Sequence, residues 1–195
     1  EIEKAVETII AGATTRIDVG KVNDRIFLNN ASLGLYPRIV RQREILQRQG
    51  WGKWLAFVRA SLSTIARYAP LRAQLKTERH GDINQKTPFV FIGNNEYLIE
   101  GSNLGQRKRL DAGSLWVYRA TQTTRLQLLW LFVAQVSGMG RGRQLKVFDT
   151  RQLQIEAPEP YLEIGLDGEV VRLATPLAIE ILPSALQVVI PATAD

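Results

Sequence analysis

The sequence predicts one mostly β domain of the α+β class, in which antiparallel strands are accompanied by a few packed helices. From Leu145 onward nearly every apolar segment is short and bounded by turn residues, as in antiparallel sheets. Asp167-Gly168 lies between two such segments and is a strong signal for a type I′ hairpin. Residues 51–69 instead repeat apolar side chains at three- and four-residue steps, which predicts an amphipathic helix that ends at Pro70.

The same patterns give the other elements in order. Gly12 ends a first helix, Pro37 starts a second, and Thr123 caps a later one. Pro183 and Pro191 each bound one of the last two strands, which we therefore expect to be separate. The expected helices span residues 1–11, 37–49, 51–69 and 123–137, and the expected strands span residues 15–19, 25–30, 71–77, 83–86, 88–93, 114–119, 161–166, 170–173, 179–182 and 186–190.

The amphipathic helix at residues 51–69 has two interpretations. Trp51 and Trp54 at its start are typical of helices that face a membrane interface. Its apolar spacing is equally typical of a helix that packs under a sheet, and we favour this second interpretation because core packing is the commoner use of such a pattern.

Composition limits the partners and the chemistry. The chain has 195 residues, 45% of them hydrophobic, which suffices for a core without metals or disulfides. It contains no cysteine, which fits a reducing compartment and excludes thiol and zinc–cysteine chemistry. Its formal net charge of +6 favours anionic partners such as nucleotide phosphates, nucleic acid or an acidic membrane leaflet. His80 is the single histidine and lies in a polar turn, so no histidine metal site is expected.

Three segments resemble one family. They are Arg16-Ile17-Asp18-Val19-Gly20 continuing to Asn30 and Gly34, then Pro88-Phe89-Val90-Phe91-Ile92-Gly93-Asn94-Asn95, then Leu166-Asp167-Gly168-Glu169 followed by Pro176, Ile179, Ile181, Pro183, Leu186, Val188 and Pro191. In this order and at these gaps they resemble the C-terminal lobe of the diacylglycerol kinase and sphingosine kinase family, which includes soluble bacterial lipid kinases.

The resemblance implies a fold and a function. The fold is an antiparallel β-sandwich-like lobe of the lipid kinase and NAD kinase type. The function is ATP-dependent phosphorylation of the hydroxyl group of diacylglycerol or a related lipid, with Mg²⁺. The family's Gly-Gly-Asp-Gly-Thr nucleotide motif belongs to a preceding lobe and does not occur here. We therefore interpret the chain as part of a longer enzyme and expect the isolated chain to be inactive. Residues 1–14 would be a remnant of the nucleotide-binding lobe, and residues 15–195 would be the β-rich lobe.

The resemblance also implies site residues. Asp18 and Glu169 are the acids expected to act in catalysis, and Asn94 is expected to bind substrate. For Glu169 a further reason is that the hairpin turn requires Asp167 and Gly168 but no acid after them. We therefore interpret Asp167 as structural.

A doubtful metal ligand and a basic surface complete the predicted site. The family has Pro, Ala and then Asp directly before Gly in a region that can hold a structural Mg²⁺. This chain has Asp111-Ala112-Gly113 there, with the acid one place early, so a metal role for Asp111 is in doubt. A basic surface for anionic lipid is expected from Arg107, Lys108, Arg109, Arg141 and Arg143.

The expected partners are the lipid substrate, an anionic membrane surface and the missing lobe, in a cytoplasmic protein associated peripherally with the membrane. No specific nucleic acid is expected, and a homodimer is left open. Two alternatives remain. One is a non-enzymatic basic module that binds nucleic acid or anionic surfaces, and the other is an enzyme like NAD kinase that acts on a soluble substrate.

Overall fold

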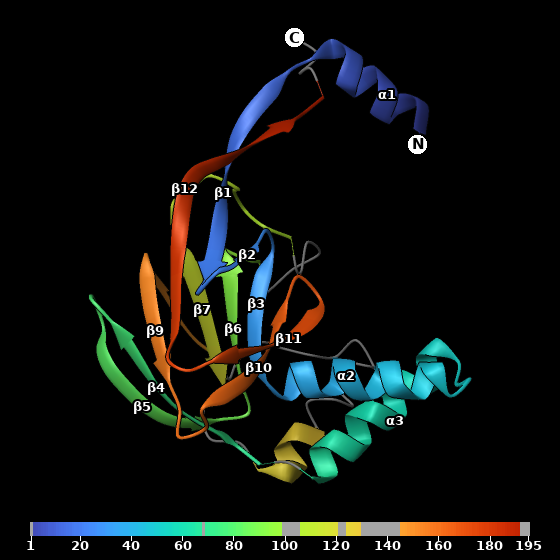
Figure 1. Cartoon of the computed structure of the whole chain (residues 1–195), viewed down its shortest axis with the longest axis vertical. Coiled ribbons are helices and arrows are strands. Elements are labelled where there is room, and N and C mark those ends of the chain that lie inside the picture. Colours follow the sequence, from blue (N-terminus) through green and yellow to red (C-terminus); the bar gives the residue numbers. More distant parts are fainter. Residues whose placement is uncertain (1, 68, 99–105, 121–123, 130–144, 192–195) are drawn as a thin grey trace.

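The computed structural model describes residues 2–67, 69–98, 106–120, 124–129 and 145–191. Within these residues two antiparallel six-stranded sheets face each other (Figure 1). The first sheet contains, in spatial order, β2 (Arg25–Phe27), β1 (Thr14–Val22), β12 (Leu177–Val189), β9 (Gln152–Glu156), β4 (Leu71–Thr77) and β5 (Gly81–Thr87). The second contains β11 (Glu169–Ala174), β10 (Tyr161–Leu166), β3 (Asn30–Gly34), β6 (Phe89–Asn94), β7 (Leu115–Ala120) and β8 (Leu145–Thr150).

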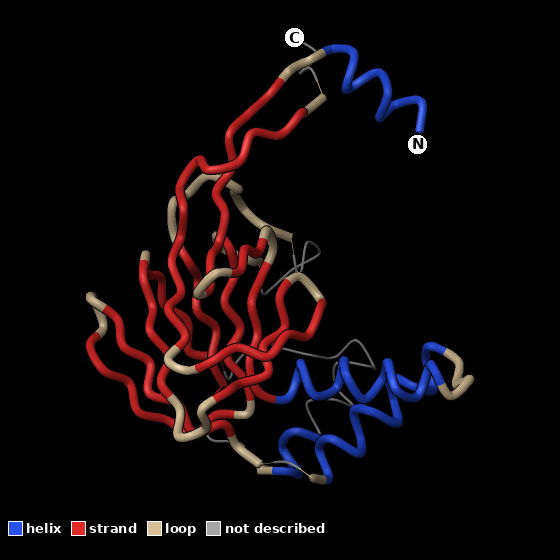
Figure 2. The backbone as a smooth tube through the Cα atoms, viewed as in Figure 1, coloured by secondary structure: helices blue, strands red, loops and turns tan. Residues whose placement is uncertain are grey.

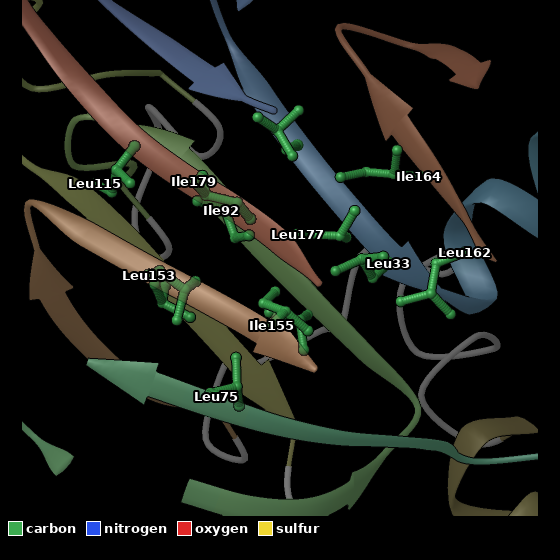
Figure 3. Close-up of a cluster of buried hydrophobic side chains, with 14 of the residues drawn as sticks. Leu33, Leu75, Ile92, Leu115, Leu153, Ile155, Leu162, Ile164, Leu177 and Ile179 are labelled. Atoms are coloured by element: carbon green, nitrogen blue, oxygen red, sulfur yellow. The ribbon is translucent and has the colours of Figure 1, made fainter. Parts of the chain in front are cut away.

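The core lies between the sheets and consists of aliphatic side chains that point inward from alternate positions (Figure 3). Leu75, Leu153 and Ile155 from the first sheet meet Leu33, Ile92 and other residues from the second. In β9, for example, Leu153 and Ile155 are buried while the residues between and beside them are not. This burial across two facing sheets confirms the predicted sandwich-like, mostly β fold.

Among the described residues, the helices α1 (Ile2–Ala11), α2 (Leu35–Arg48) and α3 (Lys53–Ala66) lie outside the sandwich. Figure 2 shows α1 at the far end of the long β1–β12 ribbon and α2–α3 as a helical hairpin beside the other end of the sheets. Here α3 packs on α2, so the expectation that it lies under a sheet was wrong. Thr124 caps a short helical segment at residues 125–129, and the rest of the helix expected up to residue 137 lies outside the described residues.

The last two expected strands form the single strand β12, which passes through Pro183. The pairing of β12 with β1 shifts between Ile17 and Val19, where Asp18 stands opposite the stretch from Pro183 to Ala185. Ser184 has φ +53° there, so this is a β-bulge, a place in a strand that tolerates proline. The sequence signal of a strand end is therefore a bulge inside one long strand.

Gly34 fixes the place where β3 turns into α2. Its φ is +94°, and a Cβ on it would lie 2.2 Å from the carbonyl oxygen of Pro88. That same carbonyl accepts the N–H of Leu35 at 2.9 Å. Gly50 in the loop between α2 and α3 has a similar φ of +90° but has open space where its Cβ would be.

We predict that Gly34→Ala destabilises the domain much more than Gly50→Ala. A positive φ costs an alanine about 1–3 kcal/mol at both positions, and the clash with Pro88 adds about 1–3 kcal/mol at Gly34 only. Urea unfolding of both variants measures the difference. Equal destabilisation would contradict the close approach of β3 and Pro88.

Candidate functional site

Asp18 lies in the middle of β1 with its carboxylate buried under three other segments. Its Oδ1 accepts the N–H of Ser184 at 2.8 Å. Its Oδ2 accepts the N–H of Gly113 at 2.7 Å and the Nδ2 of Asn95 at 3.0 Å. Asp18 is only 1% exposed, so these charge-assisted bonds replace the water that the carboxylate loses. The geometry gives Asp18 a structural task, and a catalytic role for it stays a prediction.

Asn94 ends β6 and Asn95 directly follows it, and both are fully buried. The Nδ2 of Asn94 donates to the carbonyls of Asp18 at 2.8 Å and of Leu28 at 2.9 Å. Asn95 has φ +69°, and its Oδ1 accepts the N–H of Ala112 at 3.1 Å. Asn94 therefore orients backbone of two neighbouring segments. Its predicted contact with substrate stays a prediction, and Asn95, which we did not predict, has a comparable structural role.

The Asp167-Gly168-Glu169 hairpin is docked onto the turn that joins β2 to β3. Both turn residues have positive φ, +49° and +96°, as the predicted type I′ turn requires. The carboxylate of Asp167 accepts three backbone N–H groups, from Leu28 and Asn29 at 2.7 Å and from Asn30 at 3.0 Å. This agrees with the structural interpretation of Asp167.

Glu169 directly follows this docked turn as the first residue of β11. Its side chain is exposed, and within the described residues it has no hydrogen bond or ion pair. Its backbone pairs with Leu166 across the hairpin. The sequence argument that the turn makes no demand for an acid at this position is thus consistent with the geometry, and the Glu169 carboxylate is available to an outside group.

The turn at residues 28–30 is where the predicted site residues meet. Arg107 donates to the Leu28 carbonyl at 2.7 Å, and Asn94 donates to the same oxygen. Asp167 holds the N–H groups of the turn, as described above. Asp18 is one contact away, because Asn94 also binds its carbonyl. Segments far apart in the sequence therefore converge on one short turn, and Glu169 is the exposed residue that follows the hairpin turn docked on it.

Tyr118 fixes the segment that leads from Asn95 to the basic loop. Its hydroxyl accepts the N–H of Tyr97 at 2.8 Å and donates to the Tyr97 carbonyl at 3.1 Å. Burial raises the pKa of Tyr118 to about 12, which keeps the hydroxyl protonated and able to donate. Tyr97 in turn forms a β-bridge with Arg107. This places Arg107 over the turn at residues 28–30.

Two of the other predicted basic residues, Lys108 and Arg109, are paired with acids. The Nζ of Lys108 lies 3.4 Å from the Oε2 of Glu96. The guanidinium of Arg109 donates to both carboxylate oxygens of Asp111, from Nε at 3.0 Å and from Nη2 at 3.1 Å. The hydrogen bond from Arg109 lowers the pKa of Asp111 below its ordinary value. These pairs leave less free positive charge in this loop than the sequence suggests, and Arg141 and Arg143 lie outside the described residues.

The Asp111 carboxylate is bound by Arg109 in this arrangement. Mg²⁺ needs several oxygen ligands, but both oxygens of this carboxylate are taken by a guanidinium. Across the parts of the chain that the structure describes, no three Asp, Glu or His side chains lie together as a ready-made set of metal ligands. A metal role for Asp111 therefore finds no support in the geometry.

Residues 39–190 match the family model of the YegS C-terminal NAD kinase beta sandwich-like domain. The chain belongs to this family. The match spans the Asn94 segment, the basic loop and the Asp167 hairpin, whereas Asp18 precedes the matched range.

Solved structures agree with this YegS-type fold. A structure of a candidate diacylglycerol kinase from Bacillus anthracis str. Sterne is similar over 95% of this chain, with a TM-score of 0.65 and 20% identity. A second candidate diacylglycerol kinase and a diacylglycerol kinase from the same organism have TM-scores of 0.61 and 0.56 at 21% and 17% identity. At these identities the likeness shows the fold. The YegS-type chain spans 60%, 58% and 57% of the lengths of the three structures, in the order given.

We predict that Asp167→Asn in this YegS-type domain lowers stability by about 1–2 kcal/mol, because an amide keeps only one acceptor oxygen for the three N–H groups. Asparagine tolerates the left-handed backbone, so turn strain does not contribute. Asp24→Asn, in the exposed turn after β1, is the matched control and should change stability by less than about 0.5 kcal/mol. Urea unfolding measures both, and equal effects would mean that the hairpin is not held by Asp167.

Proposed function

We propose that this domain is the C-terminal lobe of an ATP-dependent lipid kinase that phosphorylates the hydroxyl of diacylglycerol or a related lipid. The family and the three Bacillus anthracis structures named for diacylglycerol kinase activity support this class. The single observation that carries it for this chain is the Glu169 carboxylate, which is exposed and has no partner among the described residues, on a hairpin that Asp167 fixes in place.

In this proposal Glu169 acts as the general base. It accepts the proton of the lipid hydroxyl while the hydroxyl oxygen forms a bond to the γ-phosphorus of ATP and the bond to ADP breaks. Phosphoryl transfer depends chiefly on positioning and on stabilising charge. The contacts of Asp167 and Asn94 with the turn at residues 28–30 would supply positioning, because they fix the base of the hairpin.

ATP and Mg²⁺ would be held mainly by a preceding lobe, since this chain lacks the family's nucleotide motif. Mg²⁺ neutralises the charge that develops on the transferred phosphoryl group when it is bound. Arg107, which is half-buried beside the turn, is the residue of this chain best suited to an anionic phosphate. The proposed enzyme is cytoplasmic and meets its substrate as a peripheral protein on an anionic membrane. No described helix is long and apolar enough to cross a membrane.

A soluble nucleotide is the second candidate substrate, because the matched family is described as NAD kinase beta sandwich-like. The two candidates differ in the acceptor hydroxyl, and the chemistry asked of Glu169 is the same. Offering the parent enzyme dispersed diacylglycerol and NAD in parallel separates them.

We predict that Glu169→Gln in the parent enzyme lowers kcat by about 10²–10⁴-fold, the usual loss for a general base. The melting temperature should stay unchanged, since an exposed Glu→Gln swap shifts stability by about 0.5 kcal/mol or less. Glu78→Gln is the matched control, an exposed glutamate in the turn between β4 and β5.

Turnover and melting temperature are to be measured on the same preparations. A kcat for Glu169→Gln within a few-fold of that for Glu78→Gln would remove Glu169 from the mechanism. The fold assignment would then still hold, but this lobe would not supply the catalytic base through Glu169.

A further inference from the structure

The helical hairpin of α2 and α3 projects from the sandwich, and its tip lies far from the sheets (Figure 1). Near the sandwich, Leu35 and Ile65 form a small cluster with Leu128. Towards the tip the two helices are held together by a cluster of Leu46, Ala56 and Ala60. The partly buried Ile39 packs against this cluster. The alanines bring the helices close and leave the larger side chains of α3 on its outer face.

Large apolar side chains are exposed at this tip. Trp54 is 63% exposed and Leu55 is 62% exposed in the first turn of α3, and Trp51 in the preceding loop is 41% exposed. Leu62 lies two turns further along the same outer face as Leu55 and is also exposed. Exposed single apolar residues are ordinary, but adjacent tryptophan and leucine side chains at the end of a projecting element mark an interaction surface.

The hairpin also carries the positive charge of the chain. Residues 35–67 contain seven arginines and lysines and one glutamate, a formal charge of +6 that equals the net charge of all 195 residues. Arg48, Lys53 and Arg59 lie around the apolar tip and are exposed. Arg59 lies 5.0 Å from the ring centroid of Trp51. An anionic bilayer binds such a surface in two ways, because its interior takes up the apolar side chains and its headgroups attract the cations.

The exposed apolar face of α1 provides a contrast. Ile9 on α1 is 66% exposed, as much as Leu55. However, α1 carries two acids, Glu3 and Glu7, and one base, Lys4, so its net charge is negative and an anionic surface would not attract it. Both α1 and α3 therefore expose large apolar side chains, but only the α2–α3 hairpin surrounds them with positive charge.

We propose that the tip of the α2–α3 hairpin, defined as Arg48, Trp51, Lys53, Trp54, Leu55 and Arg59, docks the chain onto an anionic lipid bilayer. Trp51, Trp54 and Leu55 enter the interfacial region, where indole rings prefer to lie. Arg48, Lys53 and Arg59 stay at the level of the lipid phosphates. Trp51 and Trp54 would also suit a stacked base, but Leu55 and Leu62 extend the exposed surface with aliphatic side chains that suit the acyl boundary of a bilayer. The inference deepens the proposed function and rests on it, because a lipid kinase must bind the membrane that contains its substrate.

Vesicle binding without nucleotide tests this inference independently of catalysis. The 195-residue chain is titrated with vesicles of phosphatidylcholine alone and of phosphatidylcholine with phosphatidylglycerol. We expect binding to the anionic vesicles only, and weaker binding as salt rises because the attraction is screened. Bromine-labelled lipid should quench part of the tryptophan emission, and Trp51→Phe combined with Trp54→Phe should lower that quenching.

Matched variants separate the tip from general stickiness. Leu55→Ser should weaken binding to anionic vesicles about tenfold by loss of apolar insertion, whereas Ile9→Ser should leave it unchanged. Arg48→Gln with Lys53→Gln should weaken it about thirtyfold, whereas Arg72→Gln with Lys86→Gln on β4 and β5 should have little effect. Melting temperatures confirm that each variant is folded.

Three results would overturn the proposal. They are equal binding to neutral and anionic vesicles, equal losses in Leu55→Ser and Ile9→Ser, and tighter binding to an oligonucleotide than to anionic vesicles. None of them depends on phosphoryl transfer. A parent enzyme that is active but does not bind vesicles through the tip would therefore refute this inference alone. A parent enzyme that binds vesicles through the tip but transfers no phosphate would refute the proposed function alone.

Discussion

The buried carboxylate of Asp18 is the constraint on which the site region depends. A carboxylate removed from water costs several kcal/mol unless hydrogen bonds replace its hydration, and here three donors do so. The donors come from the β12 bulge, the loop before β7 and the end of β6. Satisfying this one charge therefore holds three segments in fixed positions around β1.

The contacts continue from there to the exposed edge of the second sheet. Asn94 binds the carbonyls of both Asp18 and Leu28, and Asp167 binds the N–H groups of the turn that begins at Leu28. Glu169 follows Asp167 by two residues. A disturbance at Asp18 should thus reach Glu169 through three hydrogen-bonded steps, although Asp18 itself faces no open space. The sandwich positions the acid, while the α2–α3 hairpin presents a separate basic and apolar surface.

Local patterns were read correctly from the sequence, and long-range partners were not. The Asp167-Gly168 turn was predicted because positive φ at two successive residues is a local demand. The bulge at Ser184 was missed because its cause, the Asp18 carboxylate, is 166 residues away in the chain. Asp18 was predicted as catalytic from the family resemblance, and its three donors could not be foreseen because they lie far from it in the sequence. The α3 helix was expected under a sheet because periodicity shows an apolar face but does not name its partner.

The central claim is that this chain is one lobe of a lipid kinase and is insufficient for catalysis alone. Transfer of labelled γ-phosphate from ATP to dispersed diacylglycerol, measured for the parent enzyme and for the 195-residue chain, tests it most directly. The account predicts labelled lipid with the parent and none with the isolated chain, which lacks the nucleotide motif. Robust transfer by the isolated chain, or none to lipid by the folded parent, would contradict it.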